Sequence, residues 1–244
     1  GLSNVVQLAG TGGPVCALDA GDRAVCWGLA ESAQGVSKIG DAVVLHERYA
    51  ARAVEIAAGS GDLCAALASG KVACWGSGNA SLKTGTLQSG IVWGIDDAVA
   101  VAAGFQASCA LRASGKVSCW GQNQRGQLGN GTLSRLPRPV RVPGLSGVRD
   151  LALEGASTCV LDSAGVTSCW GSWGAYDGKP ERASTPQRIA TTGKRILALP
   201  WEVCTVGEKG DAICYAVGAR DLIPPQKDVR DMVVGAVLST SGQL

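Results

Sequence analysis

Short apolar segments recur along the chain, and most of them stop at a glycine. They read VVQLAG, VEIAAG, VAVAAG, LALEG, ILALP and MVVG. In these segments and in those that follow them, apolar and polar residues alternate with period two. They lack the 3.6-residue period of an amphipathic helix, and this pattern predicts β-strands. No capped, periodic run of twelve residues favours a helix. We therefore expect an all-β protein.

Ten cysteines follow these segments in five pairs. The members of each pair are ten positions apart, and successive pairs begin 45 to 50 residues apart. The pairs are Cys16 and Cys26, Cys64 and Cys74, Cys109 and Cys119, Cys159 and Cys169, and Cys204 and Cys214. A regular period of this length is typical of a repeat array and matches one four-stranded blade of a β-propeller.

Each cysteine pair brackets a predicted β-hairpin, shown best by CALRASGKVSCWG at 109–121. A glycine lies six residues after the first cysteine in four units, and Asp22 takes this place in the first unit. A three-residue hairpin loop needs one left-handed residue there, which glycine adopts freely and aspartate tolerates. With such a loop Arg112 pairs with Lys116, so Cys109 stands opposite Cys119. If Arg112 and Lys116 form the closing hydrogen-bonded pair, the cysteines occupy a non-hydrogen-bonded position, with Cα atoms about 4.5 Å apart.

This register predicts five hairpin disulfides, one within each pair. The alternative is five pairs of reduced cysteines that fill space in the core, but an even number in register in every unit argues against it. A metal array is a weaker hypothesis, because no unit offers four ligands. Disulfides imply an oxidising compartment. We therefore expect an extracellular or otherwise extracytoplasmic protein, whether secreted, periplasmic or at the cell surface.

A variable polar stretch and a short fourth segment follow each hairpin, which makes about four strands per unit. The sequence thus predicts a single β-propeller domain over residues 1–244, with five to six four-stranded blades. Because the last unit is partial, two alternatives stay open: the partial blade stands as it is, or this sequence is part of a longer array. The expected units are roughly 4–52, 53–97, 98–147, 148–193, 194–228 and a partial 229–244.

Composition excludes several classes of protein. Glycine supplies 35 of 244 residues and charged residues only 17%, which suits a turn-rich β protein. The net charge of +2 is too small for a dedicated nucleic-acid surface. No run of about 18 apolar residues exists, so we expect no membrane span. The first ten residues also lack the basic start and apolar stretch of a signal peptide.

Catalytic chemistry finds little support in the sequence. His46 is the single histidine, and no cysteine, serine or carboxylate pattern accompanies it. Asp96 and Asp97 are better explained as solvated turn residues than as a paired-carboxylate site. The glycine-rich pieces lack the GK[ST] ending of a phosphate loop. We expect no enzyme activity, cofactor or metal.

Tryptophan occurs in two patterns. Trp27, Trp75, Trp120 and Trp170 recur at one place in the repeat, which favours a structural role between adjacent blades. Other aromatic residues lie off the repeating positions, on variable segments, and are candidates for contact with a partner. They are Tyr49, Trp93, Trp173, Tyr176 and Trp201. The alternative is that they fill gaps between irregular blades.

Two further patterns carry less information. Arg135, Arg138, Arg141 and Arg149 form a local basic stretch, for which a solvated face is favoured over an anion site. Asn79 and Asn130 begin glycosylation sequons, which matter only in a eukaryotic secretory pathway.

The third unit carries the most diagnostic motif. Trp120-Gly121, Asn123 and Gly126-Gln127-Leu128-Gly129, followed by Gly131-Thr132, resemble the regulator-of-chromosome-condensation repeat. The Trp-Gly pair recurs in units one, two and four, whereas unit five has Tyr215-Ala216. The resemblance implies a β-propeller, and the paired cysteines look most like the extracellular branch of that family.

The family includes a nuclear exchange factor, a secreted β-lactamase inhibitory propeller and receptor-kinase ectodomains, which share a rigid ring that presents loops to a protein. The resemblance thus implies a non-enzymatic, extracytoplasmic propeller that binds a protein partner through its loops. A glycan-binding propeller and a receptor ectodomain fragment are the alternatives. An enzyme or nucleotide exchange factor is a third hypothesis with less support.

Overall fold

The computed structural model describes the chain in segments separated by short gaps. These segments are 4–10, 15–22, 24–27, 37–39, 42–44, 52–59, 62–76, 90–173, 181–199, 202–207, 212–216, 222–226, 229–233 and 236–239. Over these residues the regular structure is entirely β, as predicted, and every strand pair is antiparallel.

The strands form six sheets that follow one another along the chain. The first contains β1 (Val5–Ala9), β2 (Val15–Asp19), β3 (Ala24–Trp27), β5 (Ala42–Val44) and β4 (Ser37–Ile39), in that spatial order. The second contains β6 (Ala53–Ala58), β7 (Asp62–Leu67), β8 (Val72–Gly76) and β9 (Gly90–Ile91). The third contains β10 (Ala98–Ala103), β11 (Ala107–Arg112), β12 (Val117–Gly121) and β13 (Leu136–Arg141).

The remaining sheets repeat this order. The fourth contains β14 (Val148–Glu154), β15 (Ser157–Asp162), β16 (Val166–Trp173) and β17 (Glu181–Thr192). The fifth contains β18 (Arg195–Leu199), β19 (Glu202–Val206), β20 (Ala212–Ala216) and β21 (Leu222–Gln226), and the sixth pairs β22 (Val229–Val233) with β23 (Ala236–Ser239). Four-stranded blades and a partial sixth sheet were predicted. The first sheet differs, since β4 adds a fifth strand.

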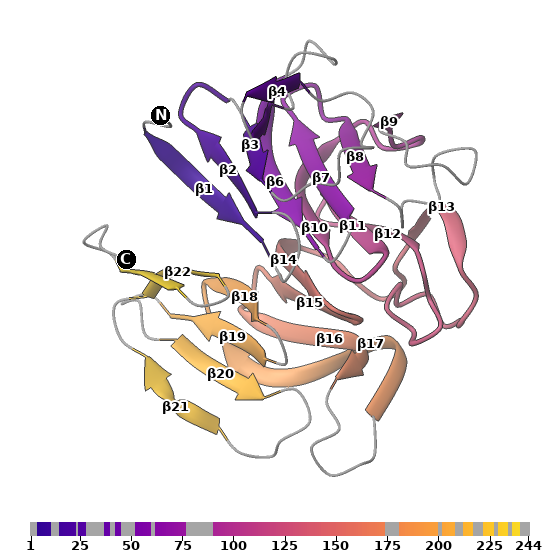
Figure 1. Ribbon diagram of the computed structural model, residues 1–244. Coiled ribbons are helices and arrows are strands. Elements are labelled where there is room, and N and C mark those ends of the chain that lie inside the picture. The colour runs from indigo at the N-terminus through magenta and orange to yellow at the C-terminus, as the bar shows by residue number, and fades with distance from the viewer. Residues whose placement is uncertain are drawn as a thin grey trace.

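The six sheets lie around a common centre, in the manner of propeller blades (Figure 1). The first strand of each sheet is nearest the centre, and these inner strands are β1, β6, β10, β14, β18 and β22. Neighbouring inner strands contact each other from β1 through to β22. The blade interfaces, rather than a single central core, therefore hold most of the buried side chains.

The predicted hairpin register is confirmed. Cys109 stands opposite Cys119, and the backbone N–H of Arg112 donates to the carbonyl of Lys116 at 2.8 Å. Four predicted pairs are disulfides with Cα atoms 4.0–4.1 Å apart. Cys204 is disulfide-bonded as well and pairs in register with Cys214.

The turns of these hairpins take the backbone conformation that the sequence predicted. Gly70, Gly115 and Gly165 have φ between 69° and 81°, and Asp22 has φ 62°. Glycine meets no penalty in this left-handed region, and aspartate tolerates it. Gly210, the fifth of the series, lies outside the described residues.

The recurring tryptophans are buried between blades, as predicted. Trp75, Trp120 and Trp170 are 2% exposed or less. The Trp170 indole N–H donates to the carbonyl of Gln127 at 2.9 Å, which ties the fourth blade to the loop of the third. The Trp27 side chain lies outside the described atoms.

The GQLG stretch of unit three owes its form to Asn123. The Asn123 side chain is fully buried, and its Oδ1 accepts the N–H of Leu128 at 2.9 Å. Its Nδ2 donates to the carbonyl of Thr132 at 2.9 Å. One side chain thereby fixes both ends of the loop that packs on Trp170.

Candidate binding surface

Trp93 is the most exposed large hydrophobic residue that the structure describes. It follows β9 and is 78% exposed. The guanidinium of Arg138, on β13 of the next blade, lies over its ring at 5.9 Å from the centroid. A cation at this distance is attracted by the ring, and holds the indole in place without covering it.

The loop that carries Trp93 is fixed from the third blade. Arg112 donates from Nη1 to the carbonyl of Gly94 at 3.1 Å and pairs with the carboxylate of Asp96 at 3.1 Å. Its Nε contacts the Asp97 carboxylate as well. The two aspartates are thus turn residues that both pair with Arg112. Trp93 is therefore presented on a braced loop, which suits a contact residue.

Of the other predicted contact residues, Trp173 has a described backbone, and it is not brought together with Trp93. Trp173 ends β16, at the end of the fourth sheet away from its hairpin turn, whereas Trp93 lies near the turn end of its sheet. The Trp173 side chain is outside the described atoms. Tyr49, Tyr176 and Trp201, together with His46 and Asn79, lie outside the described residues.

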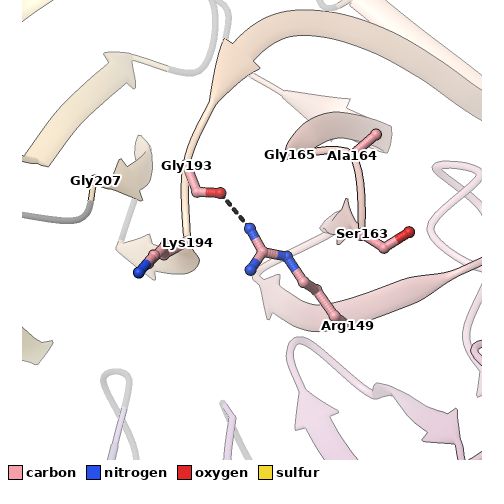
Figure 2. Close-up of a pocket in the computed structure, with 7 residues that line it drawn as sticks. All are labelled: Arg149, Ser163, Ala164, Gly165, Gly193, Lys194 and Gly207. Carbon is pink, nitrogen blue, oxygen red and sulfur yellow. Dashed lines mark hydrogen bonds between the residues drawn. The ribbon is translucent and has the colours of Figure 1, made fainter.

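A pocket between the fourth and fifth blades is a second candidate, which the sequence analysis did not assemble. It encloses about 520 Å³ and is lined by Arg149, Ser163, Ala164, Gly165, Gly193, Lys194 and Gly207 (Figure 2). The Arg149 guanidinium donates from Nε to the carbonyl of Asp162 at 3.0 Å and from Nη2 to that of Gly193. Aligning GVRD at 147–150 with TGKR at 192–195 would have placed Arg149 and Lys194 at equivalent positions.

Two carboxyl groups are buried beside the inner strands. Glu55 on β6 accepts the backbone N–H of Val101, and Asp150 on β14 accepts those of Leu151 and Ile196. Burial, followed by the nearby Asp150 carboxyl, raises the pKa of Glu55 from 4.5 to about 7, against the opposing effects of the Val101 N–H and Arg195. Burial also raises the pKa of Asp150 above 3.8.

Metal and membrane features were searched over the described segments. They contain no group of three or more histidine, cysteine or acidic residues placed to hold a metal ion. None of their elements is a helix of the length and apolarity that crosses a membrane.

Sequence comparison identifies the repeat. Two profiles of the regulator of chromosome condensation (RCC1) repeat match residues 98–127 and 114–161. No curated protein sequence matches the chain.

Solved structures extend the similarity to the whole fold. Human WBSCR16 superposes with a TM-score of 0.74 at 18% identity, over 91% of this chain and 66% of that one. Prp20p from Saccharomyces cerevisiae gives 0.71 at 19% identity, over 91% and 65%. Yeast RCC1 (Prp20) in complex with Kap60 gives 0.68 at 20% identity, over 86% and 56%. The chain thus spans 66% or less of the length of each of these proteins, and identities this low concern the fold alone.

The repeat profiles cover the unit whose Trp-Gly and GQLG motifs were singled out, and the six sheets around one centre match these structures along nearly the whole chain. The chain is therefore a β-propeller, and its residues 98–161 are repeats of the RCC1 type.

Proposed function

We propose that this chain is a non-enzymatic, extracytoplasmic propeller, a single domain with the unit boundaries given above, that binds a protein partner. The observation that carries the proposal is Trp93, which is 78% exposed on a braced loop and held by Arg138. Exposed tryptophan and arginine are the residues most enriched at the energetic centres of protein interfaces.

Similar propellers support the choice of a protein as the partner. One yeast structure is of RCC1 (Prp20) bound to Kap60, and the study of Prp20p concerns its binding to Gsp1p and histones. None of these partners transfers to this chain at 19–20% identity.

The cysteines support the proposed extracytoplasmic location. The four hairpin disulfides described above, and a fifth that includes Cys204, persist only where the surroundings do not reduce them. Mass spectrometry of the native protein, alkylated before any reduction, tests this directly. We expect no modified cysteine, and ten alkylated thiols would overturn the extracytoplasmic assignment.

Partner binding is tested by quantitative affinity purification from the source organism with three forms of the protein. The wild type, Trp93→Ala and Phe105→Ala are compared, because Phe105 is 53% exposed in the turn between β10 and β11 and serves as the matched control. We expect a set of proteins that Trp93→Ala loses and Phe105→Ala retains. The proposal fails if the three forms recover the same proteins, or if a glycan array binds the protein through Trp93 instead.

A further inference from the structure

A register shift in β13 turns Arg138 toward the second blade. Between Leu136 and Val140, β13 has two residues more than the part of β12 that faces it. Leu136 packs against the core that the third and fourth blades share, and regular alternation would place Arg138 on the same face. Instead, the Arg138 guanidinium lies over the ring of Trp93 in the second blade. An irregularity of this kind re-aims a side chain.

Arg141 lies on the same side of the third blade as Arg138 does. In the register of β12 and β13 it stands opposite Ser118. Ser118 shares its face of β12 with Trp120, whose side chain packs into the core between the second and third blades. Arg141 is itself exposed. The outer strand of the third blade therefore presents two arginines toward the blade that carries Trp93.

Lys71 adds a cation from the second blade. The N–H of Val92 donates to the carbonyl of Val72 at 2.8 Å, so the antiparallel segments around this bond lie side by side. Lys71 and Trp93 are the next residues on these two segments, in the same direction, and both are exposed. Trp93 thus has a lysine of its own blade beside its backbone and an arginine of the next blade over its ring.

The charges of these three cations are available to a partner. Within the segments that the structure describes, none of the three forms a salt bridge. The carboxylates of the Trp93 loop, Asp96 and Asp97, both pair with Arg112. A guanidinium that lies over an indole keeps N–H donors along its edge, and this edge suits a carboxylate. Because Trp93 is 78% exposed, much of its indole stays open beside Arg138.

The same loop argues against a nucleic acid as the occupant. The side chain of Asp96 is 81% exposed, although it pairs with Arg112. A nucleic-acid strand carries a phosphate on every nucleotide, so some phosphates would lie near this carboxylate. A protein segment can place an acidic side chain at the arginines and a neutral one near Asp96. Charge complementarity therefore favours a protein segment.

We propose that this surface binds an acidic segment of the protein partner. The surface consists of Lys71, Trp93, Arg138 and Arg141. An aspartate or glutamate side chain accepts hydrogen bonds from the edge of the Arg138 guanidinium, and a neighbouring apolar side chain packs on the open part of the Trp93 indole. Lys71 and Arg141 attract flanking carboxylates. The inference rests on the proposed function and names the chemistry of the partner.

The test uses the full chain and a displayed library of random twelve-residue peptides, from which peptides that also bind Trp93→Ala are removed. We expect the retained peptides to carry aspartate or glutamate next to an aromatic or aliphatic residue. Retained peptides without acidic residues would overturn the inference, as would a library in which no peptide depends on Trp93. So would tighter binding of oligothymidylate or of phosphatidylserine vesicles than of any peptide.

Fluorescence anisotropy with one retained peptide measures what the charges contribute. Arg138→Gln removes a charged hydrogen bond, and we expect about tenfold weaker binding. Arg141→Gln removes an exposed charge and leaves the cation over Trp93 in place, and we expect about threefold weaker binding. Arg188→Gln, at an exposed arginine on β17 of the fourth blade, is the control for the same change and should bind as the wild type does. Circular dichroism checks that each variant keeps the fold.

Two further measurements separate the possible failures. Changing the peptide's acidic residues to amides should weaken binding as much as Arg138→Gln does, and added salt should weaken the binding of the wild type. Binding unchanged by Arg138→Gln or by the amide peptide would overturn the inference. If Trp93→Ala abolishes partner capture while Arg138→Gln and Arg141→Gln do not weaken it, the proposed function stands and this inference alone fails. If Trp93→Ala retains every captured protein, the proposed function itself fails.

Discussion

The Oε2 atom of Glu55 lies 3.2 Å from the backbone nitrogen of Val101 and accepts its hydrogen bond across a blade boundary. Gln7 makes the same kind of contact from the first blade to Ile56, and Asp150 makes it from the fourth blade to Ile196. In the third blade Ala100 occupies the position equivalent to Gln7, Glu55 and Asp150, and its side chain is apolar. The backbone N–H of Leu151 on the fourth blade donates to the carboxylate of its neighbour Asp150 instead. A polar side chain on one inner strand thus satisfies the backbone of the next.

Replacing Glu55 by glutamine should stabilise the protein above neutral pH. The folded pKa of about 7 exceeds the ordinary 4.5, so between these values the folded protein holds a proton that the unfolded chain has lost. The stability that this group contributes is complete below about pH 4.5 and falls as the pH rises through 7, by about 3 kcal/mol in total. Glutamine stays neutral and can still accept from Val101.

Urea unfolding at pH 4.5, 6 and 8 measures this effect. The difference between Glu55→Gln and the wild type should be near zero at the lowest pH and largest at pH 8. Asp150 and Arg195 are the charged groups that act on Glu55, and both remain in the variant. Parallel pH profiles for the two proteins would show that Glu55 does not carry the shifted pKa.

Much of the fold could be predicted because the residues that determine each hairpin lie within that hairpin. The ten-residue spacing of Cys109 and Cys119 and the glycine at 115 lie within one hairpin, so register, turn and disulfide follow from strand geometry alone. The extra strand β4 was missed, since neither a cysteine nor a glycine signature marks Ser37–Ile39.

The candidate sites depend on contacts between units, which a single sequence does not display. Trp93 could be selected because it breaks the repeat, but its partner Arg138 comes from the next blade. The pocket is lined by Gly193 and Arg149, whose hydrogen bond joins residues 44 positions apart in the chain. Glu55 and Val101 are joined across 46 residues. Only the packing of blades brings these pairs together.

Removing one hairpin disulfide should lower stability by an amount set by its short loop. The double change Cys159→Ala and Cys169→Ala opens a loop of about eleven residues, for which chain entropy predicts a loss of roughly 2.5–3 kcal/mol. Both cysteines are buried, and alanine leaves no unsatisfied polar group. Guanidinium unfolding of the unreduced proteins measures the difference. Equal unfolding midpoints would mean that this bridge does not constrain the unfolded chain.

Gly129 should tolerate alanine far less than Gly144 does. Both have positive φ, 65° and 74°, so the backbone strain of about 1 kcal/mol is common to the two variants. A Cβ on Gly129 would lie 2.5 Å from the indole nitrogen of Trp170, whereas one on Gly144 meets nothing within 4 Å. We expect Gly129→Ala to cost about 3 kcal/mol or more. Thermal unfolding compares them, and similar melting temperatures would contradict the close packing at Trp170.

Asn123→Ala should destabilise the third blade and loosen its contact with the fourth. The substitution leaves the N–H of Leu128 without its acceptor, and the carbonyl of Thr132 loses a donor. Stranding the buried N–H of Leu128 costs about 1–3 kcal/mol, whereas Thr132 is exposed and its carbonyl can bond to water, so we expect a loss of roughly 2 kcal/mol. Gln124→Ala, an exposed change in the same loop, is the control and should stay within about 0.5 kcal/mol of the wild type.

Urea unfolding followed by tryptophan fluorescence reports both stability and the surroundings of Trp170, whose indole bonds to Gln127 in this loop. If Asn123→Ala matches Gln124→Ala in both readouts, then Asn123 does not organise the loop, and the contact between these blades rests on the tryptophan alone.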